Sequence, residues 1–260
     1  MKIPAVISIA SGALVISIMV SCNSSPTHST TGSYLVAGSV VADANISSTK
    51  VLADFTKNHA KVPTAVVRFG ADTLMFRRPG FPIDSVFSLT KANALYYGMG
   101  RDKLILQDSA LFTDSASLRV SDSFSIIDVV PVNRQAQGLR SVSLQWSGAD
   151  SADGYVMATA LRDSLYHGYG YSLYATSLNP AGTIPPNAFA LTNNITPDTG
   201  WYYLYVYAYT GVPDSALTAR LLPVPFPSQL ADNIAVTNMV GHFGTIRVVL
   251  HDSVHVVTLP

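Results

Sequence analysis

Apolar and polar residues alternate along two stretches in the second half of the chain. The stretch 142–146 reads VSLQW, and the stretch 202–208 reads YYLYVYA. Because successive strand residues point to opposite faces, each pattern predicts a strand with one buried face. Trp146 belongs to the buried face of the first strand. The even-numbered residues from Tyr202 to Ala208 belong to that of the second.

Short runs rich in β-branched residues fill the first half, separated by Gly and Pro turns at a spacing of roughly ten residues. Several short strands at this spacing are typical of a β-sandwich. The pattern in 65–69, followed by 104–106, resembles a small bacterial immunoglobulin-like domain. The five clearest runs are 51–55, 65–69, 73–76, 103–106 and 117–120.

The acidic residues support the same fold class. All 16 are Asp, and no Glu occurs in the chain. Asp favours turns and caps, whereas Glu favours helices. We therefore expect an all-β chain with two β-sandwich domains in tandem, at 34–127 and 128–222. A strand-rich C-terminal segment follows at 223–260.

The second half resembles a fibronectin type III domain. Trp146 matches the core Trp of that family's second strand, Tyr155 matches the Tyr that starts the third, and 202–208 matches the sixth strand. The resemblance covers about residues 128 to 222 and implies an immunoglobulin-like β-sandwich. It also implies that Tyr202 is the corner tyrosine, whose hydroxyl bonds to the backbone a few residues upstream. A family of this kind indicates architecture rather than activity.

The chain begins like an exported lipoprotein. Lys2 precedes an uncharged apolar run from 3 to 20, which is the layout of a secretory signal. Residues 19–22 (MVSC) resemble the bacterial lipobox, which implies a signal peptide at 1–21 and a palmitate-bearing Cys22. Residues 22–33 would then be a flexible tether reaching about 18 Å. An uncleaved transmembrane anchor is the alternative, since the apolar run nearly spans a bilayer.

The single cysteine restricts the chemistry further. Once Cys22 is lipidated, no thiol remains for a disulfide, and we expect no cofactor and no metal site. Asn23 stands where Asp would signal retention in the inner membrane, so we expect anchoring in the cell outer membrane. The segment 233–260, which includes GHFG at 241–244, resembles lipoproteins found beside TonB-dependent transporters.

An aromatic face is the strongest candidate for binding. If the even-numbered residues of 202–208 face the core, the odd-numbered rings face outward and form a ladder about 26 Å long. Tyr and Trp combine a flat apolar face with a polar tip, which suits a sugar ring or a protein partner. The alternatives are a face covered by another part of the chain, or β-propensity alone. The predicted binding residues are Trp201, Tyr203, Tyr205, Tyr207 and Tyr209.

Asp followed by Ser or Thr and then a small or aliphatic residue recurs along the chain. Chance would give about one or two such triplets. The triplet resembles an O-glycosylation acceptor motif of exported bacterial proteins, which implies a glycoprotein. The alternative is turn chemistry, in which Asp caps backbone amides. The acceptor hydroxyls would be those of Thr73, Ser85, Ser109, Ser115, Ser151, Ser164, Ser215 and Ser253.

Several functions lack the residues they need. The 16 Lys and Arg residues balance 16 Asp without any basic cluster, so we expect no nucleic-acid partner. No nucleophile elbow, zinc-binding His pair with Glu, phosphate loop or catalytic cysteine occurs, so we expect no enzyme. Asp150 and Asp153 fit a turn better than a calcium loop. His251 and His255 lie about 13 Å apart on a predicted strand.

The sequence therefore predicts a non-enzymatic cell-envelope lipoprotein that binds a glycan or a protein through an exposed aromatic strand face. Two alternatives stay open. The first is a structural accessory of an outer-membrane transporter or surface assembly. The second is a hydrolase whose Ser, His and Asp converge only in the fold.

Overall fold

The computed structural model describes residues 34–79, 83–92, 101–109, 112–131, 135–137, 141–149, 152–162, 170–176, 180–189, 199–219 and 221–257. The predicted signal peptide, lipidated cysteine and tether lie outside these residues. Within these ranges, no helix has the length and apolar character needed to cross a membrane. Strands dominate the described residues, so the all-β prediction is confirmed.

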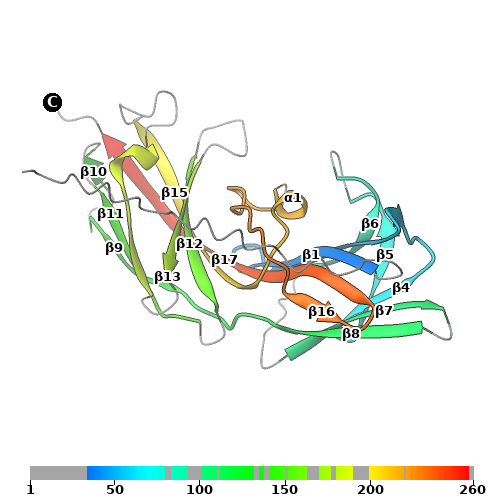
Figure 1. Cartoon of the computed structure of the whole chain (residues 1–260). Helices are drawn as coiled ribbons and strands as arrows, with labels where there is room; N and C mark the ends of the chain where they lie inside the picture. Colours follow the sequence, from blue (N-terminus) through cyan, green and yellow to red (C-terminus); the bar gives the residue numbers. More distant parts are fainter. Residues whose placement is uncertain are drawn as a thin grey trace, which may run out of the picture. The chain divides into compact units, whose positions relative to one another are not determined.

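The first half contributes the strands drawn from blue to green in Figure 1. Their bounds are β1 (Tyr34–Asp43), β2 (Ser48–Lys57), β3 (Ala60–Lys61), β4 (Val66–Phe69), β5 (Asp72–Arg77), β6 (Val86–Lys91), β7 (Arg101–Ser109) and β8 (Phe112–Arg119).

The second half contributes further strands and two single-turn helices. Their bounds are β9 (Ile126–Val130), β10 (Gln135–Gln137), β11 (Val142–Trp146), β12 (Gly154–Leu161), β13 (Gly170–Thr176), β14 (Ala181–Ile184), η1 (Pro186–Phe189), β15 (Gly200–Gly211), α1 (Ser215–Thr218), β16 (Ile234–Val236) and β17 (Met239–Val257).

The strands of the first half curl around one apolar core. Hydrogen-bonded neighbours follow the order β17-β1-β2-β6-β5-β4-β7-β8. At the end of this path β8 meets the β16–β17 turn, where the Asp114 carboxylate accepts the Asn238 backbone N–H at 2.9 Å. Inside, Phe69 stacks on Phe243 of β17 with ring centroids 6.0 Å apart. The first core therefore includes a strand from the end of the chain.

The second half is a sandwich of two sheets, as predicted. β14-β11-β9 form one sheet, and β13-β12-β15-β17 are consecutive neighbours in the other (Figure 1). Trp146 is buried between them, with its ring centroid 5.1 Å from that of Tyr155. The Tyr202 hydroxyl donates to the Phe189 carbonyl at 3.0 Å. The hydroxyl of Tyr202 therefore bonds to upstream backbone, as the resemblance implies, but its partner lies 13 positions away rather than a few.

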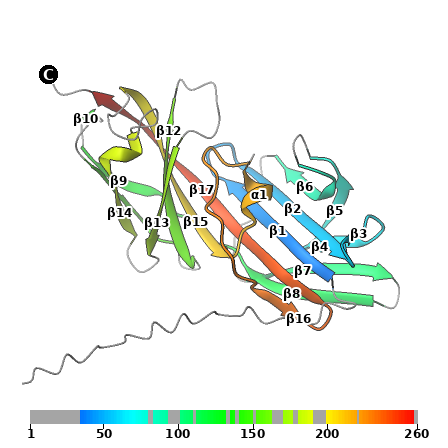
Figure 2. The ribbon, with the colours of Figure 1, turned by 45° about the horizontal axis from the view of Figure 1, so that its top comes forward.

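One strand, β17, joins the two halves. It pairs in parallel with β1 on one side, from Met239 to Val248, and antiparallel with β15 on the other, from Gly244 to Val256 (Figure 2). Gly241 is required where β17 approaches β1, because an added Cβ would lie 2.1 Å from the Val36 carbonyl oxygen. The C-terminal segment thus forms the centre of a sheet that runs through both halves.

A proline-rich segment covers a face of this joined sheet that belongs to neither of the two sandwich cores. Residues 221–227, which we call the strap, lie between β15 and β16 in the sequence. Leu222, Val224 and Phe226 of the strap are buried against side chains of β1, β12, β15 and β17. In both overall views the orange connection that carries α1 lies beside β17 (Figures 1 and 2). A third apolar cluster thus forms outside both sandwich cores.

Candidate functional site

The aromatic residues of β15 were expected to form one exposed ladder. The prediction that the even-numbered side chains from 202 to 208 face the core is confirmed, since all of them are fully buried. The prediction that the odd-numbered rings face solvent is wrong for the two central ones, because Tyr205 is 8% exposed and Tyr207 is 0% exposed. Tyr203 and Tyr209 are half-buried, and Trp201 is 39% exposed.

The strap is the physical reason for this correction. Its three apolar side chains pack on the odd-numbered face of β15 together with neighbours from β12 and β17. Phe226 lies edge-on to Tyr209, with ring centroids 5.3 Å apart. Covering these rings removes a large apolar area from water, which stabilises the covered arrangement. The middle of the ladder is therefore an internal surface.

Tyr207 fastens the strap to the sheet. Its hydroxyl donates to the Val224 carbonyl at 3.2 Å and accepts the Val224 N–H at 3.1 Å. Burial raises the pKa of Tyr207 far above its ordinary value. Burial also raises the pKa of Tyr205 to about 12. Both rings are therefore neutral at physiological pH and unsuited to acid–base chemistry.

One end of the ladder stays open. The Trp201 ring stacks on the His255 ring with centroids 4.7 Å apart and an interplanar angle of 22°. The Arg162 guanidinium lies 5.8 Å from the centroid of the Tyr203 ring. We call these four residues the open end. It combines exposed aromatic surface with hydrogen-bond donors from β17 and from the turn after β12.

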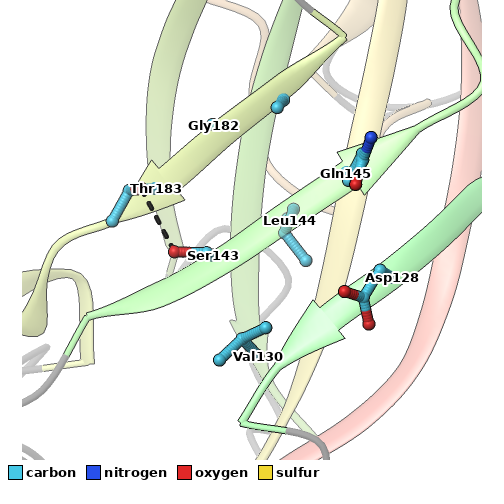
Figure 3. Close-up of a pocket in the computed structure, with 8 residues that line it drawn as sticks. Asp128, Val130, Ser143, Leu144, Gln145, Gly182 and Thr183 are labelled. Carbon is cyan, nitrogen blue, oxygen red and sulfur yellow. Dashed lines mark hydrogen bonds between the residues drawn. The ribbon is translucent and has the colours of Figure 1, made fainter.

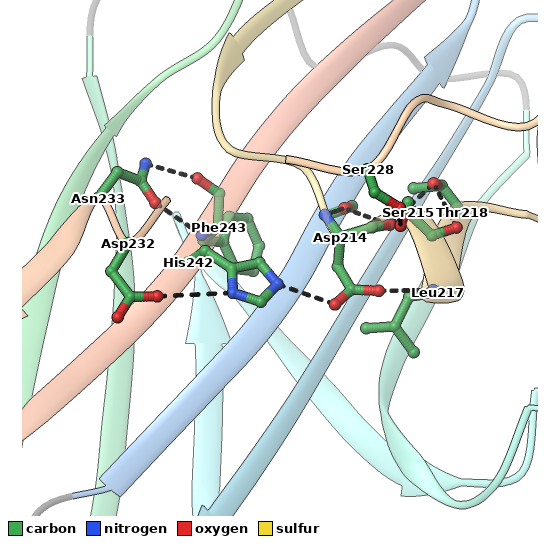
Figure 4. A network of polar contacts seen from close by, with 10 residues as sticks. Asp214, Ser215, Leu217, Thr218, Ser228, Asp232, Asn233, His242 and Phe243 are labelled. Atoms are coloured by element: carbon green, nitrogen blue, oxygen red, sulfur yellow. Dashed lines mark hydrogen bonds and ion pairs between the residues drawn. The ribbon is translucent and has the colours of Figure 1, made fainter. Parts of the chain in front are cut away.

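A polar network ties the start of the β15–β16 connection to β17 (Figure 4). His242 Nε2 lies 2.8 Å from an Asp214 carboxylate oxygen, and His242 Nδ1 lies 3.9 Å from Asp232. Asp214 also caps α1 by accepting the Leu217 N–H at 2.7 Å. The hydrogen bond to Asp214 raises the pKa of His242, although burial opposes it. Burial alone would raise the pKa of Asp214, but the bonds from His242 and Leu217 lower it overall.

The geometry around His242 does not supply a nucleophile. Both ring nitrogens face carboxylates, so neither ring nitrogen is directed at a hydroxyl. The Ser215 hydroxyl instead lies 3.0 Å from the Ser228 hydroxyl. The network therefore fits a structural clamp on the connection, and the described residues around it do not form a Ser-His-Asp triad.

Two shallow hollows lie on outer sheet faces. One, of about 270 Å³, lies beside His242 and is lined by Leu35, Val36, Ala37, Asp54, Thr56, Asp232 and Gly241. The other, of about 360 Å³, lies over β9, β11 and β14 (Figure 3). Its floor is polar, with the Ser143 and Thr183 hydroxyls 3.4 Å apart. Among the described residues, no three or more His, Cys, Asp or Glu side chains are grouped so that they could hold a metal ion.

The predicted glycosylation residues fall into distinct environments. Thr73 and Ser115 are exposed, whereas Ser85 and Ser215 are half-buried. Ser253 is 5% exposed inside β17, so the folded protein cannot carry a sugar there and this prediction is wrong. The side chains of Ser109, Ser151 and Ser164 lie outside the described residues.

Several Asp residues of the triplets have structural roles. The carboxylates of Asp84 and Asp114 each accept the backbone N–H of the following serine at 2.8 Å. The calcium-loop candidate Asp153 accepts the Gly211 N–H at 2.7 Å. The contact of Asp84 agrees with the turn-chemistry explanation of the dipeptide, whereas Asp114 makes the same contact within β8.

The strand order and the two cores define an all-β protein whose second half is a fibronectin type III-like sandwich. No protein-family model matches the chain, and no curated protein matches it. Among solved structures, the chain is similar to a two-domain fibronectin type III segment of chicken tenascin, at 8% identity and a TM-score of 0.23. That match covers 61% of this chain and 83% of tenascin's segment.

The chain is also similar to the chicken CNTN1 FN1–FN3 domains, at 10% identity and a TM-score of 0.25. That match covers 67% of this chain and 61% of the other. A cytokine receptor complex matches at 15% identity and a TM-score of 0.24, covering 75% and 98%. Because these TM-scores are low, the fold is assigned from the strand order and the cores described above.

Proposed function

We propose that this protein is a non-catalytic binding protein of the cell envelope, and that it binds a glycan or a protein at the open end. The observation that carries the proposal is the exposure of Trp201 on a strand whose central rings are buried. A large exposed aromatic ring beside Arg162 and His255 provides a stacking face with polar neighbours. Such surfaces suit sugar rings and protein anchors alike.

The proposal includes a lipid anchor at Cys22, supported by the lipobox-like residues 19–22 and by the lack of any other cysteine. Anchoring in the outer membrane would hold the open end at the envelope. The intact mass of the protein purified from its own membranes tests the anchor. It also reports whether sugars are attached, and among the described acceptors Thr73 and Ser115 are the exposed candidates. A mass equal to the unmodified chain would contradict both modifications.

Retention on insoluble envelope polysaccharides tests the binding surface. Trp201→Ala should weaken retention by roughly 30-fold, since truncation of an aromatic anchor costs about 2 kcal/mol. Ile127→Ala is the matched control, because Ile127 is an apolar residue of the other sheet that is even more exposed, at 63% against 39% for Trp201. Equal retention of the wild-type and Trp201→Ala proteins would contradict a role for the open end in glycan binding.

A second candidate function is a structural accessory of an outer-membrane transporter or surface assembly. The observation in its favour is β17, which ties both halves into one sheet and so suits a stiff spacer. Here the protein should co-purify with a membrane protein, and Trp201→Ala should not release it. Loss of that partner in Trp201→Ala would instead identify the open end as a protein interface.

A further inference from the structure

Within the described parts of β4, β7 and β8, one sheet face carries exposed cations and no acidic side chain. In antiparallel pairs, directly opposite residues share a sheet face. Arg68 of β4 lies opposite Ile105 of β7, and Lys103 of β7 lies opposite Ser117 of β8. Arg119 follows two positions after Ser117 on β8. Arg68, Lys103 and Arg119 are all exposed, so they form a diagonal row across three neighbouring strands, which we call the cationic face.

The acidic residues of β7 and β8 point to the opposite sheet face from Arg68, Lys103 and Arg119. Asp102 and Asp108 alternate with the outward residues of β7, and Asp114 does the same on β8. Asp108 contacts the Tyr34 hydroxyl on the inner side, and Asp114 accepts the Asn238 N–H. The fold therefore separates charge in a chain that has equal numbers of basic and acidic residues.

Exposed apolar side chains accompany these cations. Val66, two positions before Arg68 on β4, is 42% exposed. Thr73 lies opposite Arg68, and Met75, two positions further along β5, is 63% exposed. Cations beside exposed apolar groups are the combination found on surfaces that lie in the headgroup region of a membrane. A soluble acidic polysaccharide would give the apolar side chains nothing to contact.

We propose that the cationic face docks on the anionic phosphate headgroups of the membrane that holds the protein. This inference rests on the proposed lipid anchor. Residues 22–33 can span at most about 40 Å, and the first described residue, Tyr34, contacts β7 of this same sheet through Asp108. The anchor therefore keeps the face within reach of the membrane surface, where each Lys or Arg strengthens binding about fivefold.

The test uses the native protein reconstituted into vesicles, with a fluorophore that reports its surroundings. Ser117→Cys places a thiol on the cationic face opposite Lys103, and Ser141→Cys places one on an exposed site in the second half. Emission from residue 117 should shift to the blue in vesicles with 30 mol % phosphatidylglycerol, but not in pure phosphatidylcholine. Salt at 1 M should reverse the shift, because the screening length falls to about 3 Å. Residue 141 should respond to neither lipid.

Charge removal completes the experiment. Arg68→Ser with Lys103→Ser should lower the docking equilibrium constant about 25-fold, whereas Lys50→Ser with Arg78→Ser should leave it unchanged. Equal emission from residue 117 in both lipids would overturn the inference. Failure of the anchor is recognised separately, because an unlipidated Cys22 would itself take up the fluorophore and the protein would not float with neutral vesicles.

Discussion

Replacing Tyr207 by Phe isolates the contribution of one hydroxyl to the attachment of the strap. The substitution keeps the ring, its packing and its place on β15. It removes the donor to the Val224 carbonyl and the acceptor for the Val224 N–H. Both bonds are buried, so the two backbone groups of Val224 lose their partner in a place that water reaches poorly.

The expected cost follows from that burial. Leaving a buried donor or acceptor without a partner costs about 1–3 kcal/mol. We expect a loss of about 2 kcal/mol overall, because the strap can relax slightly and admit water to one of the two groups. For a protein of this size, about 1 kcal/mol lowers the melting temperature by roughly 2–4 °C. Tyr207→Phe should therefore melt about 4–8 °C lower than the wild type.

The chain offers a matched control two positions away. Tyr205 lies on the same face of the same strand, and its ring is also buried under the strap cluster. None of the hydrogen bonds described above involves its hydroxyl, so Tyr205→Phe should change the melting temperature by less than about 2 °C. Calorimetry of the two variants compares them directly. Equal melting temperatures for both variants would refute the view that Tyr207 fastens the strap.

Three further predictions concern the corner, the joined sheet and the clamp. Tyr202→Phe should cost about 1–3 kcal/mol in urea unfolding, because the buried carbonyl of η1 loses its donor. Gly241→Ala should cost several kcal/mol or prevent soluble expression, since φ is +132° and the new Cβ would meet the Val36 carbonyl. The clamp should stabilise the fold most between the ordinary pKa values of Asp214 and His242, 3.8 and 6.5. The raised His242 pKa contributes below 6.5 and is lost as pH rises through the folded value, whereas the lowered Asp214 pKa contributes above 3.8 and is lost as pH falls through its own. His242→Gln should flatten this profile of urea midpoints, and an unchanged profile would show that the pair is not coupled to folding.

The sequence was most informative where a pattern is local. Strict alternation around Trp146 and from Tyr202 to Ala208 identified the buried faces correctly, because strand parity needs no knowledge of distant residues. The bonding role of Tyr202 was implied by the resemblance to fibronectin type III domains rather than by alternation. Its partner at Phe189 was less predictable, since η1 lies between two strands of different sheets.

Parity could not show what lies above the second face of β15. Alternation divides a strand into two faces, but which face meets water depends on the rest of the chain. The signal for the strap was present in the sequence LPVPFP at 222–227. Apolar residues alternate there with prolines, which cannot donate to a ladder, so the segment can place every second side chain on a sheet without joining it as a strand. A covering segment of this kind is therefore marked in the sequence by apolar residues in a stretch that cannot form a strand.

The partner of β17 was equally beyond local inference. The β-branched run from Thr245 to Leu250 predicts a strand, but parallel pairing with β1 joins residues about two hundred positions apart. Loop-closure entropy and sheet geometry, rather than any local pattern, determine such pairings. The pairing also explains why the tail is so apolar. β17 places Phe243 in the first core and Val254 in the second, while Ile246 meets the strap cluster on the opposite face. A strand that serves three apolar clusters at once carries apolar residues on both of its faces, and its hydropathy reflects that position.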